Sequence, residues 1–219
     1  MAAKKKEAAD LYNNFVRDDL IAMIPDLDGA ILDVGCASGA TMKRLIEKGA
    51  SNVKGAEVSE VCVRDACANG LDVRQVDVDS LGLPFDEKSF DLVLYADVLE
   101  HLVDPWAALE SIRPYLKPGG HVLISLPNIS SYKILKRLIF FDRWDYADQG
   151  ILDRTHLRFF TRRTARQMIR GAGLEIVKEA SNCYRGGMLR VLNLLTGGGF
   201  TKFSAIQFLF LARLSEKDL

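Results

Sequence analysis

The sequence has no excess of charge of either sign and no long uninterrupted hydrophobic run. Lys and Arg number 29, as do Asp and Glu, among 219 residues. This balance does not favour a nucleic-acid partner, because binding to a phosphate backbone requires clustered positive charge. No apolar run reaches the roughly 20 residues that span a bilayer, and the polar first residues, 1–7, do not resemble a secretory signal. We therefore expect a cytoplasmic protein.

Cysteine is scarce as well. None of the four cysteines stands in a CxxC pair, and none has a histidine at the spacing of a zinc site; they are Cys36, Cys62, Cys67 and Cys183. In a reducing compartment we expect free thiols. The cysteine pattern therefore predicts no metal site.

Apolar strand patterns alternate with helical patterns along most of the chain. Strands are predicted over 30–34, 53–58, 71–76, 90–95, 121–126, 174–180 and 206–214. Helices are predicted over 12–24, 41–48, 60–69, 105–116 and 162–172. The alternation predicts an α/β fold: a Rossmann-like, doubly wound, seven-stranded and mainly parallel sheet with an antiparallel last strand.

The length suits one domain, 1–219, in which four parts can be distinguished. An N-terminal helical segment (1–28) precedes a cofactor-binding core (28–126). A long irregular insertion (127–161) follows, and a C-terminal helix with two strands (162–219) ends the chain. Because such insertions often carry specificity, we expect 127–161 to recognise the substrate.

The most informative segment is the turn after the first predicted strand. Residues 31–39, Ile-Leu-Asp-Val-Gly-Cys-Ala-Ser-Gly, lead from that strand into the next predicted helix. Gly35 and Gly39 let the backbone approach a ligand closely, and the first amides of a helix offer unpaired N–H donors. The turn therefore predicts a site for a nucleotide-type cofactor.

Acidic residues end four successive strands: Asp33, Glu57, Asp77 and Asp97. In a doubly wound sheet the ligand lies across the carboxyl ends of the strands, near the point where strand order reverses. A carboxylate at the end of the second strand can accept hydrogen bonds from both ribose hydroxyls and discourages a 2′-phosphate. Acidic residues also end strands routinely, but Glu57 is the strongest single candidate.

Glycine spacing separates two classes of cofactor. A dinucleotide site would show G-x-G-x-x-G, which residues 35–39 lack. The turn instead resembles motif I of class I S-adenosylmethionine-dependent methyltransferases, D-x-G-C-G-x-G, at Asp33, Gly35, Cys36 and Gly39. Ala37 replaces the middle glycine, and the assignment tolerates this change if Ala37 keeps a negative φ.

The resemblance continues in the family's order to about residue 128. Residues 55–59, Gly-Ala-Glu-Val-Ser, look like its ribose-binding strand end, and 77–78 lie where it contacts adenine. Residues 97–102, Asp-Val-Leu-Glu-His-Leu, are similar to its V-L-E-H-L segment beside the methionine part. The resemblance implies the cofactor S-adenosyl-L-methionine, with S-adenosyl-L-homocysteine as product. The cofactor-binding residues that it implies are Asp33, Gly35, Cys36, Gly39, Glu57, Val58, Asp77, Val78, Asp97 and His101.

Transfer of a methyl group from a sulfonium is an in-line displacement that needs alignment and exclusion of water. A hydroxyl acceptor also benefits from a base, and histidine is the side chain that titrates near neutrality. His156 and His101 are the catalytic candidates, although His101 can equally be a packing residue of the cofactor pocket. His121 begins the fifth strand, away from the expected site.

The acceptor side is read from the insertion. Arg154, His156 and Arg158 alternate, so an extended chain would place them on one side, where they can bind an anionic acceptor; a solvated charged loop is the alternative. Segments 126–130 and 153–161 resemble a MetW-like branch that includes enzymes of glycan, lipid or quinone modification. This resemblance implies methylation, chiefly O-methylation, of a small-molecule, glycan-, quinone- or lipid-linked acceptor. The substrate-binding candidates are Asn128, Tyr132, Arg154, His156 and Arg158.

Several points stay open. The aromatic and basic segment 132–146 can be a lid, an amphipathic helix in peripheral contact with a membrane, or a helix packed on its own domain, and the apolar run 188–195 leaves a similar choice. A non-catalytic, cofactor-binding partner protein would keep the same fold. A nucleotide-dependent dehydrogenase is disfavoured by the glycine spacing. The oligomeric state is not predicted.

Overall fold

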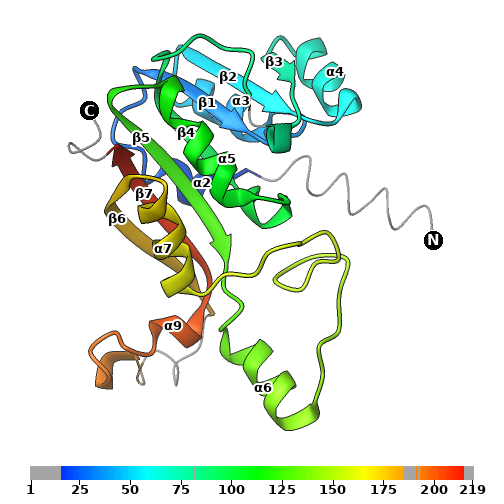
Figure 1. Cartoon of the computed structure of the whole chain (residues 1–219), viewed down its shortest axis with the longest axis vertical. Coiled ribbons are helices and arrows are strands. Elements are labelled where there is room, and N and C mark those ends of the chain that lie inside the picture. The colour runs from blue at the N-terminus through cyan, green and yellow to red at the C-terminus, as the bar shows by residue number, and fades with distance from the viewer. Residues whose placement is uncertain (1–15, 81, 185–190, 192, 215–219) are drawn as a thin grey trace.

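One seven-stranded sheet organises the chain, in the order β3-β2-β1-β4-β5-β7-β6 (Figure 1). The computed structural model describes residues 16–80, 82–184, 191 and 193–214, and the structural statements below concern these residues. The strands are β1 (Ala30–Val34), β2 (Asn52–Glu57), β3 (Asp72–Gln75), β4 (Phe90–Ala96), β5 (Leu116–Pro127), β6 (Leu174–Cys183) and β7 (Ala205–Leu214). Strands β1 to β5 pair in parallel, and β7 is antiparallel to both β5 and β6. The predicted fold class is confirmed.

Short helices connect and cover the strands. They are α2 (Asp18–Ile21), α3 (Ala40–Glu47), α4 (Glu60–Ala68), α5 (Pro105–Ser111), α6 (Tyr132–Phe141), α7 (Arg162–Gly171) and α9 (Thr201–Ser204), with 3₁₀ turns η1 (Val78–Ser80), η2 (Leu99–His101) and η3 (Arg113–Tyr115). Several begin at the side chain that the sequence suggests as a cap. Ser59, Asp104 and Thr161 accept hydrogen bonds from backbone amides in the first turns of α4, α5 and α7.

Each face of the sheet carries its own hydrophobic core. Because successive side chains of a strand point to opposite faces, Ala30 and Leu32 enter one core while Ile31 between them enters the other. The first core also takes buried residues of α5 and α7, and the second takes those of α2, α3 and α4. Helices on both faces make this a doubly wound sheet.

Two predicted helices are wrong in length. The helix expected over 105–116 ends at Ser111, and Leu116 already belongs to β5. Pro114, which has no N–H and stands in η3, explains the early end. Of the helix expected over 12–24, the described part contains the four residues of α2, and residues 12–15 lie outside the described residues.

The insertion leaves the sheet at the carboxyl end of β5. Helix α6 points away from the sheet, and an irregular chain returns from it to α7 (Figure 1). None of the residues of α6 is buried. Among the described residues, no helix has the length and apolar character that crossing a membrane requires.

Candidate active site

A cavity of about 640 Å³ opens where the strand order reverses. The chain proceeds from β1 to β2 and β3 on one side, then crosses to β4 on the other. Ligands of open α/β sheets bind at such a point, beside the carboxyl ends of the strands, and the volume is that of a small-molecule site. The cavity wall is lined by Arg17, Asp33, Gly35, Cys36, Ala37, Ala40, Thr41, Ala96, Asp97, Glu100, His101, Pro127, residues 148–151, Asp153, Thr155, His156, Ile206 and Gln207.

The glycine turn forms one side of this cavity. Gly35 has φ +68°, and a Cβ on it would lie 2.5 Å from a methyl carbon of Val98. Gly39 has φ +82°, and its Cβ would lie 2.1 Å from a methyl carbon of Leu71. Both positions therefore need glycine for conformation and for space. The negative φ required of Ala37 is contradicted, because Ala37 has φ +47°. A left-handed alanine is strained but allowed, so the turn keeps a glycine-like path.

Glu57 fixes the turn rather than facing the cavity. Its two carboxylate oxygens accept hydrogen bonds from the backbone N–H groups of Ala37 and Ser59, each at 2.9 Å. The side chain is 8% exposed. The end of β2 is thereby tied to the turn that follows β1.

Neighbouring cofactor candidates also lie outside the cavity wall. Val58 is 60% exposed, and Val78 is buried in the first core. Asp77 is exposed, and its Oδ1 accepts a hydrogen bond from the N–H of Asp79 at 3.1 Å. Gly39 is likewise absent from the wall. The structure therefore gathers Asp33, Gly35, Cys36, Asp97, His101 and His156 at the cavity, and leaves the candidates at the ends of β2 and β3 beside it.

Burial changes the acidity of the groups beneath the turn. Asp33 is 2% exposed, and burial, followed by the charge of Glu57, raises its pKa to about 7. Burial likewise raises the pKa of the Cys36 thiol, and Asp33 adds to this effect. Cys36 is therefore a protonated thiol near neutral pH, not a nucleophile.

Asp97 is engaged by an arginine from the N-terminal part of the chain. It stands just after β4 with φ +59°, and its carboxylate contacts Arg17, Ser125 and Gln207. The guanidinium of Arg17 is 4% exposed and also bonds the Oγ of Ser125 at 2.9 Å. A second acidic group, Asp19, accepts from Nε and Nη2 of Arg17 at 2.9 and 2.8 Å, and Nη2 also donates to Oε1 of Gln207 at 3.0 Å. The network joins four segments of chain at the cavity and places a cation there.

Three further groups meet at the cavity where η2 is bonded to the insertion. Glu100, His101 and His156 each offer one atom, and these atoms lie within 4.8 Å of one another. The two imidazole rings stand nearly perpendicular, with centroids 4.7 Å apart. Burial lowers the pKa of His101, with a further lowering by the charge of His156. Burial and then the charge of Asp97 raise the pKa of Glu100 well above its usual value.

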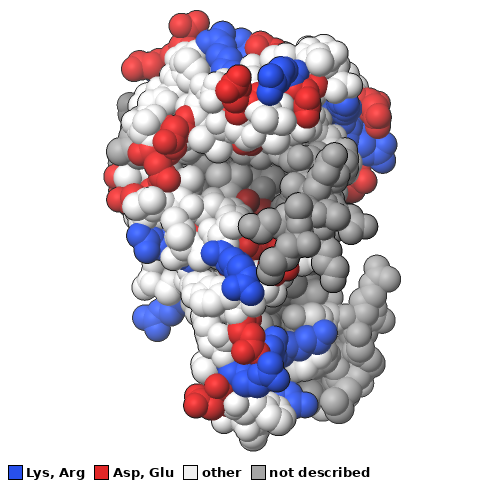
Figure 2. Space-filling model, turned by 90° about the vertical axis from the view of Figure 1, so that its right-hand side faces the viewer, with Lys and Arg blue, Asp and Glu red and all other residues white. Residues whose placement is uncertain are grey.

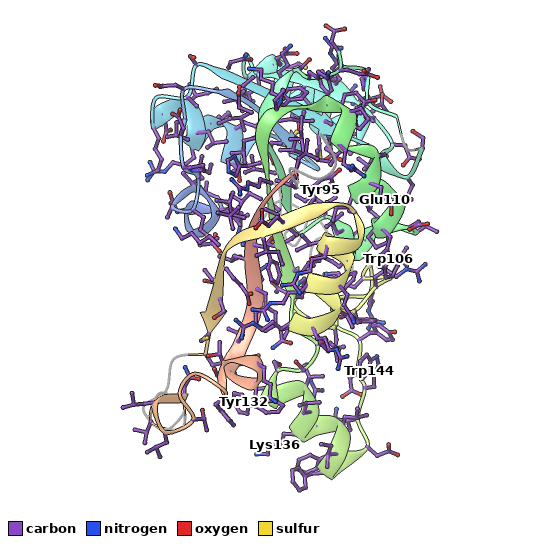
Figure 3. All side chains as sticks on the ribbon, turned by 60° about the vertical axis from the view of Figure 1, so that its left-hand side comes forward. Tyr95, Trp106, Glu110, Tyr132, Lys136 and Trp144 are labelled. Carbon is purple, nitrogen blue, oxygen red and sulfur yellow. The ribbon has the colours of Figure 1, made fainter. Side chains whose placement is uncertain are left out.

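The remaining acceptor candidates do not reach the cavity. Asn128 is fully buried, donates to the carbonyls of Lys202 and Ala205 at 2.9 Å, and accepts from Ser130. Tyr132 lies on α6, apart from Tyr95 in β4 (Figure 3), and its ring meets that of Tyr184.

The expected alternation of Arg154, His156 and Arg158 is wrong. Residues 151–155 form turns, so the chain is not extended there. Arg154 pairs with Asp148 in solvent, and Arg158 donates to the carbonyl of Val103. His156 alone of the three lines the cavity.

Sequence reasoning missed Arg17, Glu100, Asp153 and Gln207 as cavity residues. Arg17 carries no local signal, because it stands in a stretch without a motif. Glu100 does carry a local signal. It stands between Leu99 and Leu102 in an apolar pattern, and a buried carboxylate among such neighbours is unusual.

These residues fit an amino-acid nucleoside with a positive sulfonium. Asp33 and Asp97 are acceptors suited to an ammonium group, and the tight turn leaves room against its backbone. The fold and the site together define a class: α/β proteins that bind a nucleotide-type cofactor at the switch point of a doubly wound sheet.

Comparisons with known proteins narrow that class to one family. The model of a methyltransferase-domain family matches residues 6–179. A ubiquinone biosynthesis O-methyltransferase of Alkalilimnicola ehrlichii is 35% identical over 123 residues, which are 52% of this chain and 49% of that protein. The chain therefore matches about half the length of that curated relative.

Solved structures show the same fold. An S-adenosylmethionine-dependent methyltransferase of Mesorhizobium loti superposes with a TM-score of 0.65 at 22% identity, over 90% of this chain and 96% of that one. A structure described as a [4+2]-cyclase superposes with a TM-score of 0.61 at 22% identity, over 90% of this chain and 79% of that one. The chain belongs to the methyltransferase-domain family.

Proposed function

We propose that this enzyme transfers the methyl group of S-adenosylmethionine to a hydroxyl oxygen of a small or lipid-linked acceptor, a quinone precursor being the leading example. One observation carries the proposal: the glycine turn and the Glu100, His101 and His156 group line a single cavity. A donor held at the turn and an acceptor held at the imidazoles would face each other inside it. The similarity to a protein named ubiquinone biosynthesis O-methyltransferase supports oxygen as the target.

On the donor side, the chain supplies acceptors for the ammonium group of the methionine end. Asp33 and Asp97 would accept from that group. Arg17, whose N–H groups are all engaged within the protein, would orient Asp97. Glu57, at the end of β2, would turn from the amide of Ala37 toward the ribose hydroxyls. Val58, Asp77 and Val78 stand next to it, on the side proposed for the adenine. When bound, S-adenosylmethionine supplies an electrophilic methyl group that needs no covalent help from the protein.

On the acceptor side, the two imidazoles would receive the hydroxyl. Each ring offers Nε2 as an acceptor, since each Nδ1 faces a backbone carbonyl, that of Thr155 for His101 and that of Ile151 for His156. A neutral imidazole 3 Å or so from the acceptor oxygen can take its proton as the carbon–oxygen bond forms. The insertion, 127–161, would thus serve the acceptor, and 28–126 the donor.

A methylation assay with defined acceptors tests the activity. Purified protein is incubated with S-adenosylmethionine and hydroxylated quinone precursors, with and without an isoprenoid tail, and S-adenosylhomocysteine is measured. We expect acceptor-dependent release of product and methylation at oxygen. Binding of the cofactor without release on a broad panel of oxygen and nitrogen acceptors would instead indicate the non-catalytic partner protein. That alternative keeps some support, because a [4+2]-cyclase shares the fold.

Helix α6 suggests how a lipid-linked acceptor would be met. Its last residues, Ile139, Phe140 and Phe141, are 61–74% exposed, and Lys133, Lys136 and Arg137 of the same helix are exposed too. Figure 2 shows basic side chains at this lower end of the molecule, with acidic ones among them. Exposed aromatic residues beside basic ones are suited to an anionic membrane surface. We therefore propose peripheral contact through α6.

Vesicle binding tests this contact. In sedimentation with vesicles that contain an anionic lipid, Phe140→Glu is expected to lower the bound fraction about tenfold. The substitution replaces an apolar ring that would be buried in the lipid by a charged side chain. Val177→Glu on β6, which is 53% exposed and lies away from α6, is the matched control and should leave binding unchanged. Equal binding of wild type and Phe140→Glu would refute the contact.

A further inference from the structure

We propose that Glu100, His101 and His156 bind a divalent transition-metal ion, with Zn²⁺ as the best match, on the acceptor side of the cavity. The metal-binding statement stands on geometry alone. Its role in catalysis rests on the proposed methyl transfer.

The hydrogen bonds of both histidines prepare them as ligands. Nδ1 of His101 lies 3.2 Å from the carbonyl oxygen of Thr155, and Nδ1 of His156 lies 3.1 Å from that of Ile151. A carbonyl only accepts, so each Nδ1 carries the hydrogen and each neutral ring has a lone pair on Nε2. Metal-binding histidines almost always show this arrangement, in which the second nitrogen donates to a carbonyl or carboxylate.

Glu100 supplies the third ligand of the proposed site, a carboxylate beside the two neutral imidazoles. Its side chain is 1% exposed, and neither carboxylate oxygen has a hydrogen-bond partner. A buried carboxylate without partners is costly, and buried carboxylates are normally paired or bound to a metal. The nearby acidic group Asp97 is already engaged by Arg17 and Ser125, so it is not the free ligand here.

The three ligands are held together by the backbone. Glu100 and His101 share the turn η2, and the insertion carrying His156 is bonded to it, since the N–H groups of Leu157 and Arg158 donate to the carbonyl of Glu100 at 2.8 and 3.0 Å. Ligand atoms around a tetrahedral Zn²⁺ lie roughly 3.3 Å apart for bonds of about 2.0–2.1 Å. The present separations, up to 4.8 Å, require side-chain rotations that close the group by about 1–1.5 Å.

The donor set selects among metals and leaves a position open. Two imidazole nitrogens with one carboxylate suit Zn²⁺ and similar first-row ions, whereas Mg²⁺ and Ca²⁺ prefer oxygen ligands. Three protein ligands leave a fourth position, as in catalytic zinc sites. All three residues line the cavity, so that position faces the space proposed for the acceptor.

The metal would then activate the acceptor. A hydroxyl bound at the open position loses its proton to water, because a divalent cation lowers the pKa of a bound oxygen group. A lone pair of that oxygen forms the bond to the methyl carbon as the carbon–sulfur bond breaks. Its electron pair remains on sulfur, which gives neutral S-adenosylhomocysteine and a methyl ether. In this form the histidines hold the metal, and neither serves as the base.

Metal titration tests the site without any methylation assay. Protein freed of metal with a chelator is titrated with Zn²⁺ by calorimetry, and with Co²⁺ to record its visible absorption. We expect one tight site, a tetrahedral Co²⁺ spectrum and no thiolate-to-cobalt band, because no cysteine is a ligand. His156→Ala and Glu100→Gln should each weaken Zn²⁺ binding by about 100-fold or more, beyond the 10- to 100-fold typical of supporting residues.

His121→Ala is the matched control. This third histidine lies in β5 beside Arg213, outside the cavity, and its loss should leave the affinity unchanged. Circular dichroism confirms that each variant folds. The absence of stoichiometric binding by wild type, or an unchanged affinity in His156→Ala, would overturn the inference.

The two proposals fail separately. Tight metal binding with no methyl transfer to any acceptor would leave the metal site standing and refute the proposed function. Full methyl transfer in the presence of chelator, by protein that binds no metal, would refute the metal site and leave the proposed function standing. The role of base would then return to His156 or His101.

Discussion

Asp33 and Ala37 both depart from their ordinary states, and each departure can be measured. Asp33 holds its proton in the folded protein up to about pH 7, because burial disfavours its charged form. Since its pKa is higher in the folded than in the unfolded state, the folded state binds the proton more tightly. The contribution of Asp33 to the free energy of unfolding therefore falls as pH rises from about 4 to above 7.

Asp33→Asn removes this dependence. At about pH 8 the variant should be more stable than the wild type, because it avoids a buried charge, whereas at about pH 5 the two should be nearly equal. Urea denaturation at both pH values measures the difference. The same variant is expected to bind S-adenosylhomocysteine more weakly at pH 8, as it lacks the negative charge that would pair with the ammonium group. An identical stability difference at both pH values would contradict the raised pKa.

Ala37 stands where the motif that residues 33–39 resemble has glycine, and its φ is +47°. A non-glycine residue in the left-handed region costs roughly 1–2 kcal/mol, and glycine loses about 0.4–1 kcal/mol through the entropy of the unfolded chain. Ala37→Gly should therefore raise the free energy of unfolding by about 1 kcal/mol. Ala40→Gly, three residues on in α3, is the control and should lower it by a similar amount. A destabilised Ala37→Gly would show that the turn is not strained.

Among the helices, α7 shows how far local sequence determines an element. Thr161 and Thr164 form a reciprocal capping box, in which each side chain bonds the other's backbone N–H. Thr161→Ala should cost about 1 kcal/mol of unfolding free energy, and Thr161→Ser, which keeps the hydroxyl, much less. Thermal denaturation compares the two. Equal melting temperatures for the Ala and Ser variants would mean that the cap contributes nothing.

Helices α5 and α6 show the limits of such local rules. The cap at Asp104 and the proline at 105 marked the start of α5 correctly, but its end was misjudged because Pro114 interrupts a pattern that is otherwise helical. An amphipathic helix within 132–146 was one of three options, and the structure shows α6 there with no buried residue. What α6 contacts depends on surfaces that the local pattern does not contain.

For the molecule as a whole, the cavity joins residues from Arg17 to Gln207, so a ligand there should stabilise the entire fold. With S-adenosylhomocysteine at about 100 times its Kd, we expect about 2.7 kcal/mol of added stability. NAD at the same concentration should add none, because the turn lacks the dinucleotide spacing. Differential scanning calorimetry measures both, and a larger shift with NAD would favour the dehydrogenase alternative.

The sequence by itself determined the order of strands and helices, the glycine turn and the family. These features follow from local conformational needs and periodicity, which the chain records residue by residue: left-handed glycines at 35 and 39, caps at Ser59 and Thr161, and apolar strands buried on two faces.

The tertiary structure alone decided which side chains share the cavity. Arg17 reaches Asp97 across 80 residues of sequence, and His156 meets His101 because the insertion is bonded to the backbone of Glu100. Spacing suggested that Arg154 and Arg158 would join His156, but turns at 151–155 direct them to solvent and to Val103. Long-range contacts depend on how loops fold back over the sheet, and no local pattern in the sequence encodes that path.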